Sequence, residues 1–174
     1  RRIDVVVIDG GRGLISVVDD GCGMTAEELN LACERHATSK LPDDDLIRIS
    51  SLGFRGEALP SIGAVSRLEI TSRAMDSDGA WSIRVEGGDK QAPAPAALGG
   101  GTRVEVRDLF YATPARLKFL KTARTEQNRC LEVMRRLAMA YPAIGFSLSD
   151  GSRKLLKLAP SPGELFVARL DRLA

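Results

Sequence analysis

Two β-branched segments at the start of the chain restrict its fold most strongly. Residues 3–8 and 14–18 are rich in valine and isoleucine, and three glycines lie in the short stretch between them. β-branched residues favour strands, and glycine supplies the positive φ angles that tight turns require. The chain is therefore predicted to begin with an antiparallel hairpin, which makes a sheet the centre of the fold.

Length and charge exclude several classes of protein. The chain has 174 residues, enough for one domain with a packed core, and 44% are hydrophobic and 28% charged, which is typical of globular proteins rather than of disordered or membrane-spanning ones. A net charge of +2 does not by itself indicate nucleic-acid binding. Without an apolar segment near the N-terminus, we expect a cytoplasmic protein with no membrane contact.

Later segments alternate between helix and strand patterns. Thr25 and Glu28 have the spacing of a capping box, which predicts a helix to about Glu34. Residues 90–101 resemble a Pro, Ala and Gly connector with little to pack. The order of elements indicates an α+β protein, with helices on one face of a mixed, mostly antiparallel sheet. Strands are predicted at residues 67–72, 81–86, 102–106, 146–148 and 155–158, and helices at 57–64 and 125–141.

The first motif with chemical meaning is Asp19-Asp20-Gly21-Cys22-Gly23, directly after the second strand. An ionised carboxylate only accepts hydrogen bonds, so it suits the amino group of adenine and would repel the carbonyl oxygen of guanine. Glycines allow the backbone to approach a planar base closely. An ordinary Asp-Gly turn is the alternative interpretation.

The second motif is the sequence LGFRGEAL at residues 52–59, which leads into a predicted helix. Backbone N–H groups at such a helix start form a phosphate site, and a glycine-rich connection is the alternative. Counted from Gly56 as the cap, Pro60 falls at the fourth position, where no N–H is required. The preceding loop adds hydroxyls and an ammonium group at residues 38–40. Neither a Walker loop nor a Rossmann fingerprint is present.

Four strings together, DDGCGM, RHATSK, LGFRGEAL and GGTRVEVRDLFYATPARLKFL, resemble the N-terminal ATPase region of the MutL family of DNA mismatch repair proteins. That family belongs to the GHKL class, with gyrase B, heat-shock chaperones and sensor histidine kinases. The resemblance runs from about residue 3 to residue 158. It implies a GHKL (Bergerat) ATPase-like sandwich at 1–158, truncated at its N-terminus, followed by a linker and the start of another domain at 159–174.

The resemblance also implies a nucleotide site. Asp19 would bind adenine, with Gly21 and Gly23 lining the base pocket and Thr102 beside Asp19. Asp20 stands where the family usually has Asn, and we expect it to face away from the base. The residues at 38–40 and 53–59 would form the lid and phosphate cradle. The predicted nucleotide-binding residues are Asp19, Gly21, Gly23, Thr38, Ser39, Lys40, Gly53, Phe54, Arg55, Gly56, Glu57, Ala58, Leu59 and Thr102.

By the same resemblance, ATP with Mg²⁺ would order the lid and make two N-terminal regions self-associate around DNA. The parent protein would act with mismatch-recognition and downstream repair proteins near the bacterial nucleoid. Two alternatives stay open. The chain could be a binding and dimerisation module with poor nucleotide affinity, or it could belong to another GHKL ATPase of the topoisomerase or histidine kinase type.

Catalytic residues are not expected within the chain. In the GHKL class a general-base Glu and a magnesium-ligand Asn lie four residues apart on a helix before the first strand, and no E-x-x-x-N pattern occurs in the 174 residues. We expect this segment to precede Arg1. Because a general base contributes roughly 10²- to 10⁴-fold in rate, the chain by itself is expected to have essentially no ATPase activity and weak or absent nucleotide binding.

The cysteines and one basic segment are further features of the sequence. The three cysteines, Cys22, Cys33 and Cys130, lack metal-site spacing and are expected to be small buried residues. Residues 115–136 are rich in Lys and Arg, so they form either a solvated helix face or a DNA phosphate contact. The candidate DNA-binding residues are Arg116, Lys118, Lys121, Arg124 and Arg129.

Overall fold

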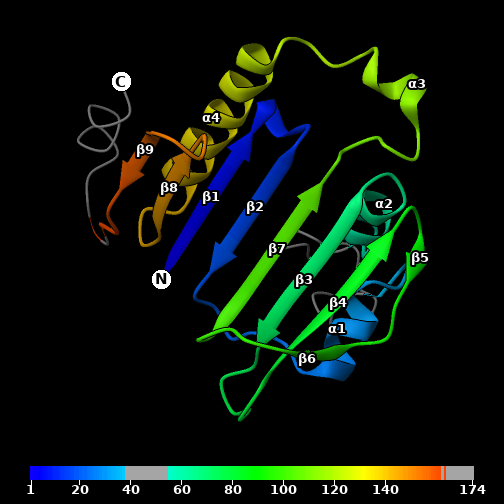
Figure 1. The fold of residues 1–174 in the computed structure, drawn as a ribbon. Helices are drawn as coiled ribbons and strands as arrows, with labels where there is room; N and C mark the ends of the chain where they lie inside the picture. Colours follow the sequence, from blue (N-terminus) through cyan, green and yellow to red (C-terminus); the bar gives the residue numbers. More distant parts are fainter. Residues whose placement is uncertain (38–54, 162, 164–174) are drawn as a thin grey trace.

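The computed structural model describes residues 1–37, 55–161 and 163 (Figure 1). Its strands are β1 (Arg2–Ile8), β2 (Leu14–Asp19), β3 (Arg67–Arg73), β4 (Ala80–Glu86), β5 (Asp89–Lys90), β6 (Ala94–Ala96), β7 (Gly101–Arg107), β8 (Gly145–Ser149) and β9 (Lys154–Leu158). Within the described residues they form one sheet in the order β5-β4-β3-β7-β2-β1-β8-β9, with β6 paired to β4. The pairing of β1 with β8 is parallel, and the other pairings are antiparallel.

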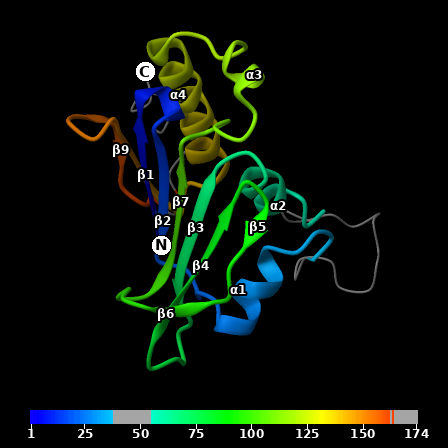
Figure 2. The same cartoon turned by 45° about the vertical axis from the view of Figure 1, so that its right-hand side comes forward.

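The helices are α1 (Ala26–Ala32), α2 (Ala58–Gly63), α3 (Pro114–Leu117) and α4 (Ala123–Ala140), and a short 3₁₀ turn spans Asp9–Gly11. Figure 2 shows α1, α2 and α4 on the same side of the sheet. No helix in the described ranges is both long and apolar enough to cross a membrane. The predicted α+β class, with helices on one face of a mixed sheet, is confirmed.

An apolar row across the sheet explains why the helices gather on that face. Val5, Val17, Val104 and Ile70 lie opposite one another in successive strands, and Leu148 continues the row. Directly opposed residues share a face of a sheet, so this row presents one continuous apolar surface. Helix α4 covers one end of this surface and α1 with α2 covers the other, which gives two adjoining core clusters.

Local signals account for the helix that adjoins the site. The predicted capping box at α1 is present. The Thr25 hydroxyl accepts a hydrogen bond from the Glu28 N–H (3.3 Å), and the Glu28 carboxylate accepts one from the Thr25 N–H (2.8 Å). Both bonds satisfy N–H groups that a helix start leaves unpaired. The helix ends at Ala32, two residues before the predicted end.

Two elements differ from the sequence prediction. The connector at 90–101 is not without structure, because β6 within it pairs with β4, Pro95 lying opposite Trp81. Proline lacks a backbone donor, so it is tolerated on an edge strand such as β6. The short helix α3 was not predicted, because its four residues are too few to show a helical period.

Candidate functional site

A polar row lies two residues beyond the apolar row, on the same face of the sheet. Asp19 of β2 is opposite Thr102 of β7, and Thr102 is opposite Ser72 of β3. Side chains alternate between the two faces of a strand, so these three polar side chains face the helices as the apolar row does. Ser72 is fully buried and Thr102 is 8% exposed. The apolar core therefore ends in a row of hydrogen-bonding groups.

A cavity of about 820 Å³ adjoins Asp19 and Thr102. The glycine loop after β2, helix α1 and the start of α2 form its other walls. The structure places Thr102 beside Asp19, and it brings together residues from both sequence motifs. The predicted nucleotide-binding residues that line the cavity are Asp19, Gly21, Gly23, Arg55, Gly56, Glu57, Ala58, Leu59 and Thr102.

The remaining predicted nucleotide-binding residues are Thr38, Ser39, Lys40, Gly53 and Phe54, which lie outside the described residues. The described part of the predicted phosphate cradle is therefore its C-terminal end, from residue 55 onward. The base side of the predicted site, in contrast, is described completely.

Glycines in the loop after β2 allow close backbone contacts within the protein itself. A Cβ on Gly23, which has a φ of +69°, would lie 1.9 Å from the Arg73 carbonyl oxygen. A Cβ on Gly21 would lie 2.6 Å from Oδ1 of Asp19, which accepts a hydrogen bond from the Gly21 N–H (2.9 Å). The loop also bonds to the strand end through Met75 N–H and Cys22 C=O (3.0 Å). These contacts fix the Asp19 carboxylate at the rim of the cavity.

Asp20 faces away from the cavity. Its carboxylate accepts a hydrogen bond from the Arg2 N–H (2.7 Å), and this bond is the largest cause that lowers the pKa of Asp20. Asp20 is not among the residues that line the cavity. Two adjacent aspartates thus point to different parts of the molecule, one to the cavity and one to β1.

The start of α2 contacts His36 and Ala37, the last described residues of the preceding loop. Gly56, with a φ of +60°, approaches Ala37 so closely that a Cβ would lie 2.4 Å from the Ala37 carbonyl oxygen. His36 Nδ1 is 2.9 Å from Glu57 Oε1. The helix is capped by Glu57 rather than Gly56, so Pro60 is its third residue and not the fourth. Proline is tolerated at this position because the first N–H groups of a helix have no partner within the helix.

The described part of the chain contains no cluster of metal-ligating side chains. Among residues 1–37, 55–161 and 163, no three His, Cys, Asp or Glu side chains are grouped so that they could hold a metal ion. Among these described residues, Mg²⁺ therefore has no ready-made cluster of protein ligands.

Sequence reasoning missed several cavity residues. Glu28 and Leu31 of α1 face the cavity, and their three-residue spacing on a capped helix could have indicated a shared face. Cys22 also lines the cavity and is exposed, so its predicted burial was wrong. Cys33 and Cys130 are half-buried, and desolvation raises the pKa of both thiols.

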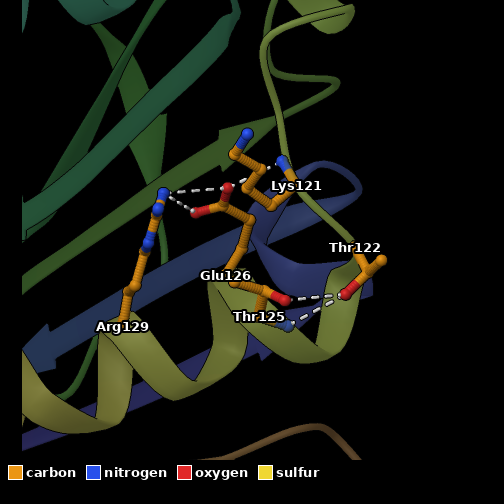
Figure 3. A network of polar contacts seen from close by, with 5 residues as sticks. All are labelled: Lys121, Thr122, Thr125, Glu126 and Arg129. Carbon is orange, nitrogen blue, oxygen red and sulfur yellow. Dashed lines mark hydrogen bonds and ion pairs between the residues drawn. The ribbon is translucent and has the colours of Figure 1, made fainter.

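The basic segment spans α3, a connector and the first turns of α4. Glu126 organises it, as Figure 3 shows, because its carboxylate accepts a hydrogen bond from the Lys121 N–H (2.8 Å) and pairs with the Arg129 guanidinium (3.2 Å). The Thr122 hydroxyl caps α4 by accepting a bond from the Thr125 N–H (3.3 Å). Arg129 is thus partly neutralised, unlike the other candidate DNA-binding residues.

Those other candidates are exposed cations. Arg116 on α3, Lys118 and Lys121 in the connector and Arg124 on α4 form no ion pair with any residue in the described ranges. Phe119, which is 81% exposed, lies among them in the sequence. The structure therefore presents a short cationic stretch with an exposed aromatic ring.

The fold and the site together define a class of protein. The mixed sheet covered by helices on one face, with a carboxylate at a strand end and a glycine loop beside a cavity, matches the arrangement that the resemblance to the GHKL class implies. No protein-family model matches the chain. Among curated proteins, the DNA mismatch repair protein MutL of Paramagnetospirillum magneticum is 65% identical over 173 residues, and that of Rhodospirillum rubrum is 64% identical over 172.

Both alignments cover 99% of this chain but only 28% and 27% of those proteins, so the chain spans just over a quarter of their length. Among solved structures, the MutL ATPase domain of Aquifex aeolicus complexed with ADP superposes with a TM-score of 0.78 at 29% identity, covering 99% of this chain and 60% of that one. Over nearly all of its length the chain is similar to MutL proteins, and it has the fold of the MutL ATPase domain.

Proposed function

We propose that this chain is the adenine-nucleotide-binding part of a MutL-type DNA mismatch repair protein. The carboxylate of Asp19 at the rim of the cavity carries the proposal. Its Oδ1 takes one hydrogen bond from Gly21, and a carboxylate has further lone pairs that can accept an N–H from a ligand. The cavity volume of about 820 Å³ is in the range of small-molecule sites.

The family supports a wider role for the whole protein. Nucleotide binding would drive self-association of N-terminal regions around DNA, and the protein would act with mismatch-recognition and downstream repair proteins. Hydrolysis would use a general-base Glu and a magnesium-ligand Asn, and the E-x-x-x-N pattern expected to carry them does not occur in the 174 residues. The comparisons favour this role over a topoisomerase or histidine kinase, because the named relatives and the solved neighbour are all MutL proteins.

Ligand-detected NMR tests the nucleotide proposal, because saturation transfer reports weak binding that calorimetry misses. We expect ADP to receive saturation from the protein and GDP to receive little at the same concentration. Adenine offers an amino donor to Asp19, whereas guanine offers a carbonyl oxygen that the carboxylate repels. Equal transfer to both nucleotides, or none to ADP, would contradict the proposal.

DNA is proposed as the partner of the cationic stretch. Arg116, Lys118, Lys121 and Arg124 are exposed, and their side chains form no ion pair within the described part of the chain. Phosphate contacts by such residues release counterions. Lys118→Ala is expected to lower affinity for duplex DNA and to reduce the slope of log K against log salt by about 0.9.

Fluorescence anisotropy with labelled DNA at several salt concentrations measures this slope. Arg136→Ala is the matched control, because Arg136 of α4 pairs with Glu132 and its charge is already compensated. A slope that Lys118→Ala leaves unchanged, or that Arg136→Ala reduces equally, would count against a phosphate contact at Lys118.

A further inference from the structure

Ser72 occupies a position in the polar row that the proposed nucleotide contacts do not use. Its side chain is fully buried in β3 and is not among the residues that line the cavity. Its Oγ nevertheless lies 2.8 Å from the Met24 N–H nitrogen, 2.8 Å from the Thr102 Oγ1 and 3.0 Å from the Gly101 carbonyl oxygen. One hydroxyl thus connects the glycine loop, strand β7 and strand β3.

The single proton of Ser72 determines how these three contacts are made. A hydroxyl donates one hydrogen bond and accepts two. The Met24 N–H can only donate to Ser72, and the Gly101 carbonyl can only accept from it. All three contacts are hydrogen bonds only if Ser72 gives its proton to Gly101 and the Thr102 hydroxyl gives its own proton to Ser72.

This arrangement fixes what Thr102 offers to the cavity. With its proton directed to Ser72, the Thr102 oxygen presents only lone pairs to a ligand. Asp19 lies directly opposite Thr102 in the paired strands, where neighbouring side chains are about 5 Å apart. The cavity rim therefore carries two adjacent acceptors, one charged and one neutral.

We propose that Ser72 is a positioning residue that makes Thr102 a hydrogen-bond acceptor for the nucleotide base. The two acceptors match an exocyclic amino group, which has two N–H donors, reached directly or through one water. Ser72 selects for such an amino group without touching the base. The inference rests on the proposed nucleotide function of the same cavity.

A ligand pair separates this role from a merely structural one. ADP carries the amino group, and the diphosphate of purine riboside carries hydrogen in its place. Loss of a merely structural contact would weaken the binding of both ligands equally, whereas loss of the acceptor at Thr102 would weaken the binding of ADP alone. The measured quantity is the dissociation constant of the purine riboside diphosphate divided by that of ADP, each from a saturation-transfer titration. For Ser72→Ala we expect this ratio to fall about fivefold, the effect of one neutral hydrogen bond.

Two further variants keep the test decisive. Thr102→Val removes the acceptor while it preserves the shape of the side chain, so it is expected to reduce the ratio as Ser72→Ala does, and the double variant should reduce it no further. Ser66→Ala is the matched control. Ser66 is also fully buried, but its hydroxyl donates to the Ile62 carbonyl (2.7 Å) and it does not line the cavity, so the ratio should not change.

The outcomes distinguish the two proposals. If ADP does not bind the unmodified chain, the proposed function fails and the inference fails with it. If ADP binds in preference to the purine analogue and both Ser72→Ala and Thr102→Val leave that preference unchanged, the role of Ser72 is wrong while the proposed function stands. A reduced preference in Ser66→Ala as well would show a general packing effect and would also overturn the inference.

Discussion

Asp19→Asn is expected to weaken ADP binding by about 10- to 100-fold, the loss that follows from one hydrogen bond to a charged group. The amide oxygen of the substituted side chain can still accept the Gly21 N–H, a bond of 2.9 Å in the present structure. The loop therefore keeps its conformation, while the amide NH₂ now faces the base and opposes the amino group of adenine. Titration with ADP gives the affinity, and thermal unfolding shows that the fold is retained.

Asp20→Asn provides the control, because it makes the same chemical change one residue away. The Asp20 carboxylate binds the Arg2 N–H and does not line the cavity. We expect its substitution to leave the ADP affinity unchanged. A similar loss in both variants would mean that net charge, rather than a contact with the base, controls binding. An unchanged affinity in Asp19→Asn would remove the adenine assignment altogether.

Gly101→Ala is expected to destabilise the whole protein by at least about 3 kcal/mol. Gly101 has a φ of +76°, and a Cβ there would lie 2.0 Å from the Asp19 carbonyl oxygen. That oxygen belongs to the backbone of the neighbouring strand, so it cannot rotate away as a side chain could. The substitution must separate β2 from β7 at the point where Asp19 and Thr102 meet, which disturbs the fold and the cavity together.

Unfolding in urea measures this loss, and the melting temperature should fall by about 6–12 °C. Gly99→Ala tests the same change in the same tripeptide. No heavy atom lies within 4 Å of a Cβ on Gly99, and its φ is not in the left-handed region. The free energy of unfolding of the Gly99→Ala variant should stay within about 0.5 kcal/mol of that of the unmodified chain. Equal effects of the two substitutions would refute the close approach at Gly101.

Features encoded over short distances were predictable from the sequence. The capping box of Thr25 and Glu28 and the N-terminal hairpin depend on residues only a few positions apart, and both are confirmed. The two motifs that contribute to the cavity were also found, because glycines and acidic residues stand out at strand and helix ends. Their nucleotide contacts stay predictions.

Features that depend on strand pairing were not predictable. The position of Thr102 beside Asp19 follows from the register of β2 with β7, and a register has no signal in one strand alone. The pairing implicates Ser72 in the site, although nothing in its sequence neighbourhood distinguishes it from Ser66. Likewise, β6 forms only because β4 offers it an edge. Family resemblance supplied the place of Thr102, and the physics of the local sequence did not.

The parallel pairing of β1 with β8 also has a consequence for how the molecule is made. Val5 lies beside Leu148, more than 140 positions later in the chain, and closing so long a loop makes folding slow. During synthesis, β1 can form its hairpin with β2 early, but its other edge stays open until the ribosome has delivered the last strands. In that interval the nascent chain exposes a valine-rich strand edge, the kind of surface that chaperones protect from aggregation.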